Sequence, residues 1–372
     1  MNIPFHKSGL SYICWDKYAE NLGKLNSFQG SMQLQVKLAE RCRQFCDGEN
    51  FYFVNSGTAA LELALMSIRL KLGDEVILPS LTFSSCANAV LRAGGVPCFA
   101  EISLPDLHVT LENILPLVSN RTKAIMIVEY AGTRAQLSDI HDFCTKQNIT
   151  LILDSAQSFG AAGQNDQSKL ADFICYSFHD TKVFSCGEGG LLIVNNHNYV
   201  DTVNIMFEKG TNRREFFNGK VDKYSWQDTG SSFILSDVNL LLLSMQLDKR
   251  NDILRDKKSA IALYIDFFNR YDGENIFAFS KHERSSNGHI FWLLLKDLDA
   301  LQYIQTSLLA QDINTTTHYV PLHSSPYSVR ESFKCARDMS LTTHAGQCLL
   351  RLPVIDKDQT EKIIFTLNNI LR

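Results

Sequence analysis

The sequence predicts an α/β fold, with a mostly parallel, seven-stranded sheet in a large domain and a smaller C-terminal α/β domain. Over the first two thirds of the chain, short apolar segments alternate with segments of helical periodicity. Such alternation is typical of parallel strands that are covered by helices on both faces. A long helical stretch follows at residues 235–270, and after it the pattern changes to mixed strands and helices, so we place a domain boundary near residue 250. We therefore expect a large domain at residues 1–250 and a small domain at residues 251–372.

Seven short apolar segments account for the strands of the large domain. In chain order they are residues 51–54, 75–78, 96–100, 123–128, 150–153, 172–176 and 190–194. A helix is expected to begin at residues 56–58, because the apolar residues that follow recur three and four positions apart: Leu61, Ala64, Leu65 and Ile68. A second helix is predicted at residues 84–93. One long helical stretch at residues 235–270 leads into the mixed pattern, which includes residues 289–295.

The composition of the 372-residue chain is that of a globular enzyme, with 45% hydrophobic and 20% charged residues. The net charge of −4 and the scattered lysines and arginines argue against a nucleic-acid partner. No apolar run approaches the length of about 18 residues that a membrane span needs. The amino terminus also lacks the charged and then apolar pattern of a secretory signal. We therefore expect a cytoplasmic protein with no membrane partner.

The ten cysteines and ten histidines do not form a metal-binding pattern. The chain contains no C-x-x-C pair and no H-E-x-x-H motif. Cys42 and Cys46 lie four residues apart in a helical pattern, and the other cysteines are dispersed. We expect most cysteines to be reduced and buried as small apolar side chains, and we expect no metal.

Lys182 is the candidate nucleophile, because it lies between a predicted strand and a glycine-marked bend. A lysine whose pKa is lowered by burial or by a nearby cation attacks carbonyl groups, and an aldehyde cofactor is its usual partner. Asp154 follows a predicted strand directly, at the edge where open α/β sheets bind ligands. Its carboxylate could pair with the protonated pyridine nitrogen of pyridoxal phosphate. The simpler alternatives are a helix cap for Asp154 and a solvated lysine at 182.

The loop at residues 55–60, Asn-Ser-Gly-Thr-Ala-Ala, is the candidate phosphate site. Gly57 would let an anion approach the backbone, and Thr58 supplies a hydroxyl. The helix that follows offers N–H groups and the positive end of its dipole. Ser177 could add a further donor, and Phe83 could stack on a flat ring. The alternatives are an ordinary helix cap for the loop and a core position for Phe83.

Four segments together resemble the DegT, DnrJ, EryC1 and StrS family of sugar aminotransferases. They are NSGTAAL at 55–61, GDEVILPSLTF at 73–83, DSAQS at 154–158 and SFHDTK at 177–182. The likeness runs over nearly the whole chain. It implies the type I fold of aspartate aminotransferase-like enzymes and pyridoxal 5'-phosphate as the cofactor. It also implies a homodimer whose two active sites each take residues from both subunits.

The same resemblance implies a role for each matching residue. Lys182 would hold the cofactor covalently and then move a proton between the cofactor and the substrate carbons. Asp154 would keep the pyridine nitrogen protonated. The other matches would bind the cofactor: Gly57, Thr58 and Ser177 at its phosphate, Phe83 on its ring and Gln157 near its ring oxygen. L-Glutamate is the implied amino donor, and a keto-sugar would collect the amino group in a second half-reaction.

Within the family, further segments are similar to the enterobacterial transaminases of TDP-4-oxo-6-deoxyglucose. These segments are NIPFHK at 2–7, EKGTNR at 208–213, DKY at 222–224, WQDTGSS at 226–232 and HYVPLH at 318–323. The similarity narrows the substrate class to nucleotide-linked 4-keto-6-deoxy-hexoses. It implies dTDP-4-amino-4,6-dideoxy-D-galactose as the product, for a cell-surface polysaccharide.

Four residues of these segments are candidates for contacts with the nucleotide-sugar. Lys209 and Arg213 could meet the diphosphate, or they could belong to a solvated basic loop. His318 and His323 could line the sugar end of the pocket, or they could be structural histidines.

Three features depart from the family pattern. Many members have Gly-Tyr-Asn-Tyr-Arg, whose asparagine reaches the cofactor phosphate of the partner subunit, where this chain has Gly-Ser-Ser-Phe-Ile at 230–234. Ser232 could keep one of these hydrogen bonds, while the arginine is absent. Glu129 stands where a histidine is common near the cofactor. It could change how a substrate is held, or it could pair with a nearby base. Residues 163–169 are polar and predict a surface loop.

Other functions are weighed against this one. The amino group could be placed equatorially to give the gluco product, or it could be placed at carbon 3. A sugar dehydratase of the same family replaces the lysine by histidine, and Lys182 argues against it. An inactive protein that only binds or regulates would not need to retain both Asp154 and Lys182.

Overall fold

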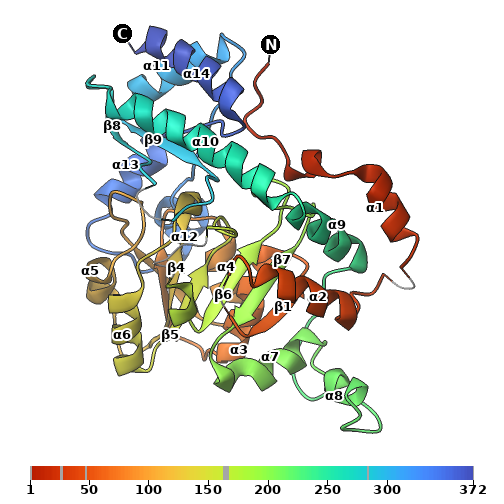
Figure 1. Cartoon of the computed structure of the whole chain (residues 1–372). Helices are drawn as coiled ribbons and strands as arrows, with labels where there is room; N and C mark the ends of the chain where they lie inside the picture. Colours follow the sequence, from red (N-terminus) through yellow and green to blue (C-terminus); the bar gives the residue numbers. More distant parts are fainter. Residues whose placement is uncertain (1, 26–27, 47, 162–166, 283–284, 372) are drawn as a thin grey trace.

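A seven-stranded sheet lies at the centre of the computed structural model, which describes residues 2–25, 28–46, 48–161, 167–282 and 285–371 (Figure 1). In spatial order the strands are β1 (Asn50–Val54), β7 (Gly190–Val194), β6 (Phe173–Ser177), β5 (Thr150–Asp154), β4 (Thr122–Val128), β2 (Glu75–Pro79) and β3 (Val96–Ala100). The predicted α/β fold class is confirmed. All seven predicted strands are present, and their ends differ from the prediction by at most one residue.

The sheet is flanked by helices on both faces (Figure 1). The helices of the described residues are α1 (Trp15–Leu22), α2 (Met32–Cys42), α3 (Gly57–Ile68), α4 (Ser85–Arg92), α5 (Leu111–Ile114), α6 (Ser138–Gln147), α7 (Val200–Phe207), α8 (Arg213–Phe217), α9 (Asp237–Leu247), α10 (Arg250–Asn269), α11 (Leu298–Leu309), α12 (Pro326–Glu331), α13 (Ser340–Cys348) and α14 (Lys357–Ile370). Short 3-10 turns are η1 (Gly9–Tyr12), η2 (Leu115–Leu117), η3 (Tyr130–Gly132), η4 (Ser168–Leu170), η5 (His197–Tyr199) and η6 (Leu322–Ser324). The helices predicted after residue 56 and at 84–93 correspond to α3 and α4.

The side chains of the central sheet alternate between two apolar cores. Strand β4 shows the alternation, since Ile125 and Ile127 belong to one core and Ala124 and Met126 to the other. Helices α3, α4 and α7 contribute to the core that contains Met126, and α2, α6 and α9 contribute to the core that contains Ile127. Burial on both faces explains why these strands are nearly continuous apolar runs in the sequence.

Strand β7 is antiparallel to the other strands of the central sheet. The pairs β2–β3, β2–β4, β4–β5 and β5–β6 are parallel, whereas β7 is antiparallel to both β1 and β6. A parallel return needs a crossover connection, usually through a helix, and residues 178–189 between β6 and β7 contain none. Both ends of this connection, which carries Lys182, therefore lie at the carboxyl edge of β6.

The prediction of one continuous helix at residues 235–270 is wrong, because α9 ends at Leu247 and α10 begins at Arg250. The N–H of Lys249 donates to the carbonyl of Gln246, three residues back, at 2.9 Å. Gln246 is fully buried, and its Oε1 accepts from the Ser185 N–H. This contact joins distant segments, so helical periodicity alone could not reveal the break.

A second, antiparallel sheet follows in the chain. Its order is β10 (Thr316–Thr317), β11 (Leu349–Leu352), β9 (Phe291–Leu295) and β8 (Ile276–Phe279). The amino terminus lies beside this part of the chain, since the Ile3 N–H donates to the Asp312 carbonyl at 2.8 Å (Figure 1). A domain boundary near residue 250 stays a prediction. A boundary at that position assigns the amino terminus to the large domain, although Ile3 is hydrogen-bonded to Asp312 beyond the boundary.

Within the described ranges, no helix has the length and apolar character needed to cross a membrane. That part of the chain also contains no group of three or more His, Cys, Asp or Glu residues placed to hold a metal ion. Eight of the ten cysteines are buried, and Cys14 and Cys335 are exposed. Residues 163–166 of the predicted surface loop lie outside the described residues.

Candidate active site

The carboxyl edge of the central sheet gathers the predicted site segments. Val54, Gly190 and Ser177 lie side by side, because β7 pairs with β1 on one side and with β6 on the other. Asp154 is the last residue of β5, and it pairs with Cys175 of β6. The segments that follow Val54 and Ser177 therefore leave the sheet close to Asp154.

Two glycines bring the start of α3 against this edge. A Cβ atom at Gly190 would lie 2.4 Å from the carbonyl oxygen of Ser56, and a Cβ atom at Gly57 would lie 2.7 Å from the Cβ of Ser177. These distances are too short for any other residue, so glycine is required here by close approach of the backbone. The Ser56 Oγ accepts from the Ala59 N–H at 3.0 Å and caps the helix. The start of α3 and Ser177 together form a narrow cradle.

The cradle presents donors suited to a phosphate group. The first turn of α3 supplies N–H groups and the positive end of the helix dipole. The Thr58 Oγ1 lies 2.7 Å from the Ser85 Oγ, and the Ser177 Oγ accepts from the His179 N–H at 3.3 Å. The structure thus brings the predicted Gly57, Thr58 and Ser177 together.

Asp154 is a buried carboxylate with two hydrogen-bond donors. The Cys86 thiol donates to its Oδ2 at 3.0 Å, and the Ala156 N–H donates to its Oδ1 at 2.9 Å. Burial raises the pKa of the Asp154 carboxyl, while these donors and the nearby Lys182 oppose the rise. A protonated ring nitrogen bound beside Asp154 would act in the same direction as Lys182 and keep the carboxylate ionised.

Lys182 lies on an anchored loop. Its N–H donates to the His179 carbonyl at 2.9 Å, and the residues that follow it, Val183 and Phe184, are buried. Burial lowers the pKa of the Lys182 amine, and although Asp154 opposes this effect, Arg351 adds to it. An amine with a lowered pKa is more often unprotonated, which is the state that attacks an aldehyde.

Tyr319 joins three predicted site residues in one wall. The Gln157 Nε2 donates to the Tyr319 hydroxyl at 3.5 Å, while the Gln157 Oε1 accepts from the Ala131 N–H at 2.8 Å. The Tyr319 ring stacks on His318 with centroids 3.7 Å apart and lies 6.2 Å from the Phe83 ring. Phe83 is 58% exposed, so the alternative of a core position does not hold for it.

The two histidines of the 318–323 segment have different surroundings. The His318 Nδ1 lies 3.2 Å from the Tyr130 hydroxyl. Burial lowers the pKa of His318 to about 2, with a contribution from two nearby cations, one of which is Lys182. His318 is therefore a neutral group close to the candidate nucleophile. His323 instead lies 2.7 Å from the Ser80 Oγ through its Nδ1.

Glu129 forms an ion pair with Arg134. Pairing with a nearby base was one of the two roles that the sequence suggested for Glu129. Its Oε2 lies 2.8 Å from the Arg134 Nη1, and both side chains are buried. The same carboxylate accepts from the hydroxyls of Ser155 and Ser158 and from the Ala135 N–H. The pair therefore fixes the ends of β4 and β5 around the Asp154 segment.

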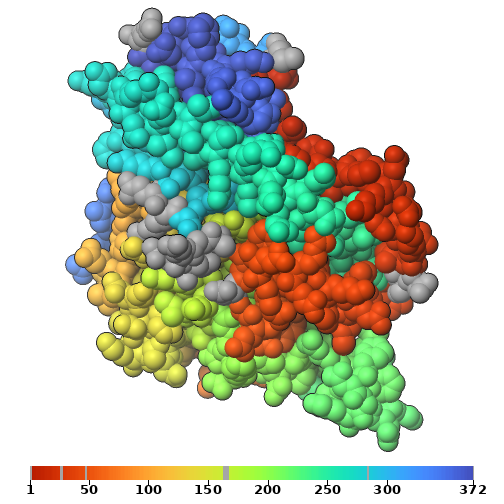
Figure 2. Space-filling view, viewed as in Figure 1, coloured from red at the N-terminus to blue at the C-terminus, as the bar shows by residue number. Residues whose placement is uncertain are grey.

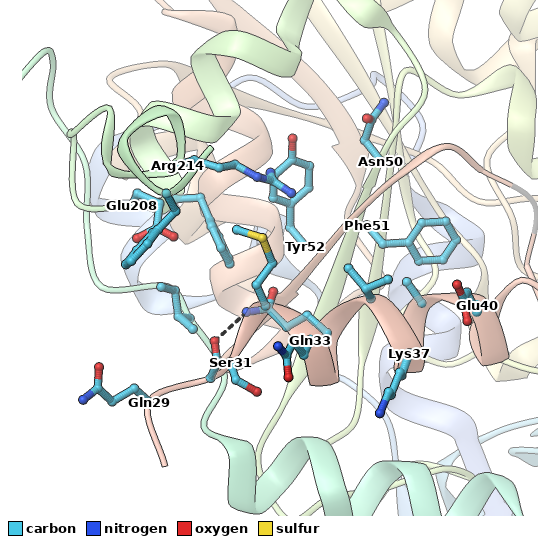
Figure 3. Close-up of a pocket in the computed structure, with 18 of the residues that line it drawn as sticks. Gln29, Ser31, Gln33, Lys37, Glu40, Asn50, Phe51, Tyr52, Glu208 and Arg214 are labelled. Carbon is cyan, nitrogen blue, oxygen red and sulfur yellow. Dashed lines mark hydrogen bonds between the residues drawn. The ribbon is translucent and has the colours of Figure 1, made fainter. Parts of the chain in front are cut away.

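Lys209 and Arg213 lie on a different part of the molecule. Arg213 is the first residue of α8, and its Nη1 lies 3.5 Å from the Glu208 Oε2. It lines a cavity of about 1100 Å³ between α2, β1 and α8, which neither Lys182 nor Asp154 lines (Figure 3). Lys209 precedes it in a left-handed backbone conformation, with a φ of 64°.

Ser232 is exposed and lies next to the predicted phosphate loop. Its carbonyl accepts from the Asn55 Nδ2 at 3.1 Å, and the Asn55 N–H donates to the Phe233 carbonyl at 2.9 Å. The Ser232 backbone also bridges to Glu208. These bonds tie the 230–234 segment to the edge of the cavity that Arg213 lines.

The sequence analysis did not single out three residues that lie at the site. Cys86 donates to Asp154, Tyr319 joins the wall, and Arg351 lies close enough to Lys182 to lower its pKa. Tyr319 falls inside the segment that resembled the family, between the two histidines, so a signal for it existed. Cys86 and Arg351 carry no local signal, because only the fold brings them to the sheet edge.

The residues present fit pyridoxal phosphate. The Asp154 carboxylate matches the ring nitrogen, and the Lys182 amine matches the aldehyde. Gly57 packs so closely on Ser177 that a Cβ at this position would lie 2.7 Å from the Ser177 Cβ, so the start of the helix and the Ser177 hydroxyl could both face one phosphate. Asp154, Lys182 and the start of α3 could therefore hold an electron-withdrawing cofactor with the Lys182 amine beside it.

Replacing Glu129 by glutamine is expected to destabilise the protein by about 3–5 kcal/mol, because the buried Arg134 guanidinium loses its carboxylate partner. Urea unfolding followed by circular dichroism measures the change. Glu20→Gln is the control, since its ion pair with Lys24 is exposed, and it should leave the midpoint unchanged. A wild-type midpoint for Glu129→Gln would show that the buried pair does not hold the strand ends.

His318 is expected to make stability fall as the pH falls through 6.5. The folded protein keeps this side chain neutral down to about pH 2, so below pH 6.5 only the unfolded chain gains the proton. Between pH 7.5 and 5.5, the wild type should lose about 1.4 kcal/mol more unfolding free energy than His318→Gln. Urea unfolding of both proteins at the two pH values measures this. Equal losses would contradict the lowered pKa.

Comparison with known proteins identifies the family. The model described as the DegT/DnrJ/EryC1/StrS aminotransferase family matches residues 24–369. The dTDP-4-dehydro-2,3,6-trideoxy-D-glucose 4-aminotransferase of Saccharopolyspora spinosa is 26% identical over 286 residues, which cover 75% of this chain and 74% of that protein. The GDP-perosamine synthase of Vibrio cholerae is 26% identical over 324 residues, which cover 85% of each.

Solved structures share the fold over the whole chain. PseC of Helicobacter pylori, an aminotransferase, has a TM-score of 0.87 at 19% identity, and the match covers 100% of this chain and 99% of that one. A putative sugar aminotransferase of Streptococcus pneumoniae in its PMP form has a TM-score of 0.88 at 20% identity, with 99% of each chain covered. The predicted aminotransferase-like architecture is thus confirmed. Because the family match spans nearly the whole chain, the protein belongs to the DegT/DnrJ/EryC1/StrS aminotransferase family and is a pyridoxal phosphate-dependent sugar aminotransferase.

Proposed function

We propose that the protein transfers the amino group of L-glutamate to carbon 4 of dTDP-4-dehydro-6-deoxy-D-glucose. The products would be dTDP-4-amino-4,6-dideoxy-D-galactose, for a cell-surface polysaccharide, and 2-oxoglutarate. The observation that carries amino transfer is the position of Lys182, a partly buried lysine whose amine has a lowered pKa and interacts with the Asp154 carboxylate. The similarity of residues 2–7, 208–213 and 318–323 to the transaminases of TDP-4-oxo-6-deoxyglucose supports the sugar.

Lys182 is proposed to attach the cofactor and to transfer protons in both half-reactions. Bound pyridoxal phosphate supplies an aldehyde and a ring that withdraws electrons from the substrate carbon. The Lys182 amine would hold the cofactor through its aldehyde and would be released when the donor amine takes its place. The freed Lys182 amine then moves a proton away from the donor carbon, and in the second half-reaction it delivers a proton to carbon 4 of the sugar. The sugar ketone loses its oxygen as water, and 2-oxoglutarate takes its new oxygen from water.

The surrounding residues orient this chemistry. Asp154 would keep the ring nitrogen protonated. The Cys86 thiol and the Ala156 N–H hold the two oxygens of the Asp154 carboxylate in place. The start of α3 at Gly57 would bind the phosphate. Phe83 would stack on the ring, and Gln157, Tyr319 and the neutral His318, which lie together in one wall, would face the sugar. His323 lies five residues after His318 in the same segment, and its Nδ1 contacts the Ser80 Oγ.

Amino transfer at carbon 4 has support from one relative. The printed name of the Saccharopolyspora spinosa protein specifies a dTDP-linked 4-dehydro sugar and a 4-aminotransferase. At 26% identity, this relative favours carbon 4 over carbon 3 for the present chain. The galacto configuration rests on the similarity of the segments named above.

We further propose that the protein works as a homodimer with shared active sites. The segment around α8 projects from the body of the molecule (Figure 2). It exposes large aromatic side chains, with Phe217 at 58%, Tyr224 at 50% and Trp226 at 78% exposure. A projecting aromatic surface of this kind suits contact with a second copy. That contact would carry Lys209 and Arg213 to the diphosphate, and Ser232 to the cofactor phosphate, of the partner's site.

The product of the reaction tests the proposal. The purified protein is incubated with TDP-4-keto-6-deoxyglucose and L-glutamate, and the ring couplings of the product are read by proton NMR. An axial amine at carbon 4 gives small couplings at that carbon, which is the expected result. Large couplings on both sides of the amine-bearing carbon would indicate the gluco product, and an amine at carbon 3 would contradict the position.

Two variants test whether product formation depends on Lys182. Lys182→Ala is expected to lower the rate at least about 1000-fold, because the acid-base group is lost. Lys71→Ala changes an exposed lysine outside the site and should keep the wild-type rate. Formation of product by Lys182→Ala at the wild-type rate would remove Lys182 from the mechanism.

A further inference from the structure

The turn that carries Lys182 is bound by an amino-terminal segment, residues 3–9, which we call the strap. The His6 Nε2 lies 2.9 Å from the Asp180 carbonyl oxygen, and because a carbonyl can only accept, this nitrogen is the donor. The Ser8 Oγ donates to the Asp180 Oδ1. The strap therefore binds Asp180 through both its backbone and its side chain, two residues before Lys182.

The strap also packs against the chain directly after Lys182. Gly9 is buried, and a Cβ atom at Gly9 would lie 3.0 Å from the Val183 carbonyl oxygen and 2.7 Å from the Gln246 Nε2. The Gln246 Oε1 in turn accepts from the Ser185 N–H. The strap thus contacts the loop on both sides of Lys182 in the sequence.

Both ends of the strap are anchored to the C-terminal part of the chain. At its start, the Ile3 N–H donates to the Asp312 carbonyl at 2.8 Å, and the Ile3 carbonyl accepts from the Asn314 N–H at 3.1 Å. Shortly after its end, the Tyr12 hydroxyl donates to the Asp256 Oδ2 at 2.7 Å. These bonds fix the strap, so that it can hold the turn in place.

The turn at residues 179–182 has few other bonds. The Lys182 N–H donates to the His179 carbonyl at 2.9 Å, and the His179 Nδ1 lies 2.9 Å from the Thr181 Oγ1. Within the described ranges, only the strap donates hydrogen bonds to this turn from outside the segment 177–189. The position of the turn therefore depends on the strap.

The place of the Lys182 backbone matters because its side chain is long. A lysine amine stands on a flexible four-carbon stem, so the place of the Cα atom sets where the amine can reach. Displacement of a reacting group by about 1 Å can cost about 100-fold in rate. A fixed backbone below a mobile side chain suits an amine that has to attach a cofactor and then transfer a proton.

We propose that the strap positions Lys182 for attachment of the cofactor and for proton transfer, with His6 and Ser8 as positioning residues that act through Asp180. This role rests on the proposed function of Lys182. Neither His6 nor Ser8 needs to touch a substrate. Since Ser8 acts through the Asp180 carboxylate, loss of the Ser8 hydroxyl and loss of that carboxylate should have effects that do not add.

Hydrogen exchange of the cofactor-free protein tests the positioning without catalysis. The Lys182 amide reports on the turn, because its N–H is bonded within it. Ser8→Ala and Asp180→Ala should each speed exchange of this amide about 10-fold, as expected for the loss of one hydrogen bond to a charged group. His6→Phe, which keeps a ring but no donor, should speed it about 5-fold.

Conservative variants and a neighbouring serine serve as controls for this exchange. Ser8→Thr keeps the hydroxyl and Asp180→Asn keeps an acceptor, so both should exchange within about threefold of the wild type. Ser11→Ala, at an exposed serine of η1, should have no effect. Wild-type exchange in Ser8→Ala and Asp180→Ala would overturn the proposal.

Binding of two forms of the cofactor separates positioning from general damage. Pyridoxal phosphate joins the Lys182 nitrogen through its aldehyde, with loss of water, whereas pyridoxamine phosphate carries an amine there and cannot join it. Ser8→Ala should raise the Kd for pyridoxal phosphate about 10-fold and leave the Kd for pyridoxamine phosphate within about twofold. Equal changes in the two Kd values would show a merely structural role and would contradict the proposal.

The half-reaction with L-glutamate gives a third measurement. At saturating donor, the yellow cofactor absorbance should be lost at least about 10-fold more slowly in Ser8→Ala, and Ser8→Thr should restore the rate. The double variant Ser8→Ala, Asp180→Ala should be no slower than Asp180→Ala alone. Additive losses would mean that Ser8 does not act through Asp180.

These outcomes distinguish the strap from the proposed function. If the wild type reacts with L-glutamate in a Ser8-dependent way but fails to aminate the 4-keto sugar, the proposed sugar is wrong and the role of the strap stands. If the wild type aminates the sugar, and Ser8→Ala and Asp180→Ala match it in exchange, cofactor binding and the half-reaction, the function stands and the role of the strap is refuted.

Discussion

Two groups of opposite charge at one edge of the sheet constrain the rest of the site. Asp154 is buried and Lys182 is partly buried, and burial shifts their pKa values in opposite directions, up for the carboxyl and down for the amine. Their mutual attraction offsets part of each shift. A cofactor ring placed between them meets a counter-charge for its nitrogen at one end and a nucleophilic amine at the other. Amino transfer needs both, and neither group would serve if it were solvated.

The topology of the sheet explains how the two groups meet. Strand β7 returns antiparallel to β6, so the loop with Lys182 begins and ends at the edge where β5 delivers Asp154. Gly190 at the start of β7 leaves room for the first turn of α3, which completes the phosphate cradle. The buried pair of Glu129 and Arg134 fixes the strand ends behind Asp154.

The sequence predicted those parts of the protein whose signals are local. The seven strands are apolar runs, and Asp154 directly follows one of them, so its place at the carboxyl edge did not depend on the strand order. Lys182 was predictable for a similar reason, since it follows β6 within a few residues. Cys86 reaches Asp154 across 68 residues, and Arg351 comes from the second sheet, so only the three-dimensional packing could reveal them. The break between α9 and α10 lies beside a buried contact of Gln246 with the distant Ser185, which helical periodicity in the sequence does not indicate.

Covalent capture of the cofactor tests the account most directly. The holoenzyme is reduced with borohydride, digested, and mapped by mass spectrometry to locate the lysine that carries the cofactor. We expect the peptide with Lys182 to carry the whole label and the yellow absorbance to be lost on reduction. Lys257 is the strongest competitor, because it is also buried and burial lowers its pKa to about 8. Label on Lys257 or on any lysine other than Lys182 would contradict the account.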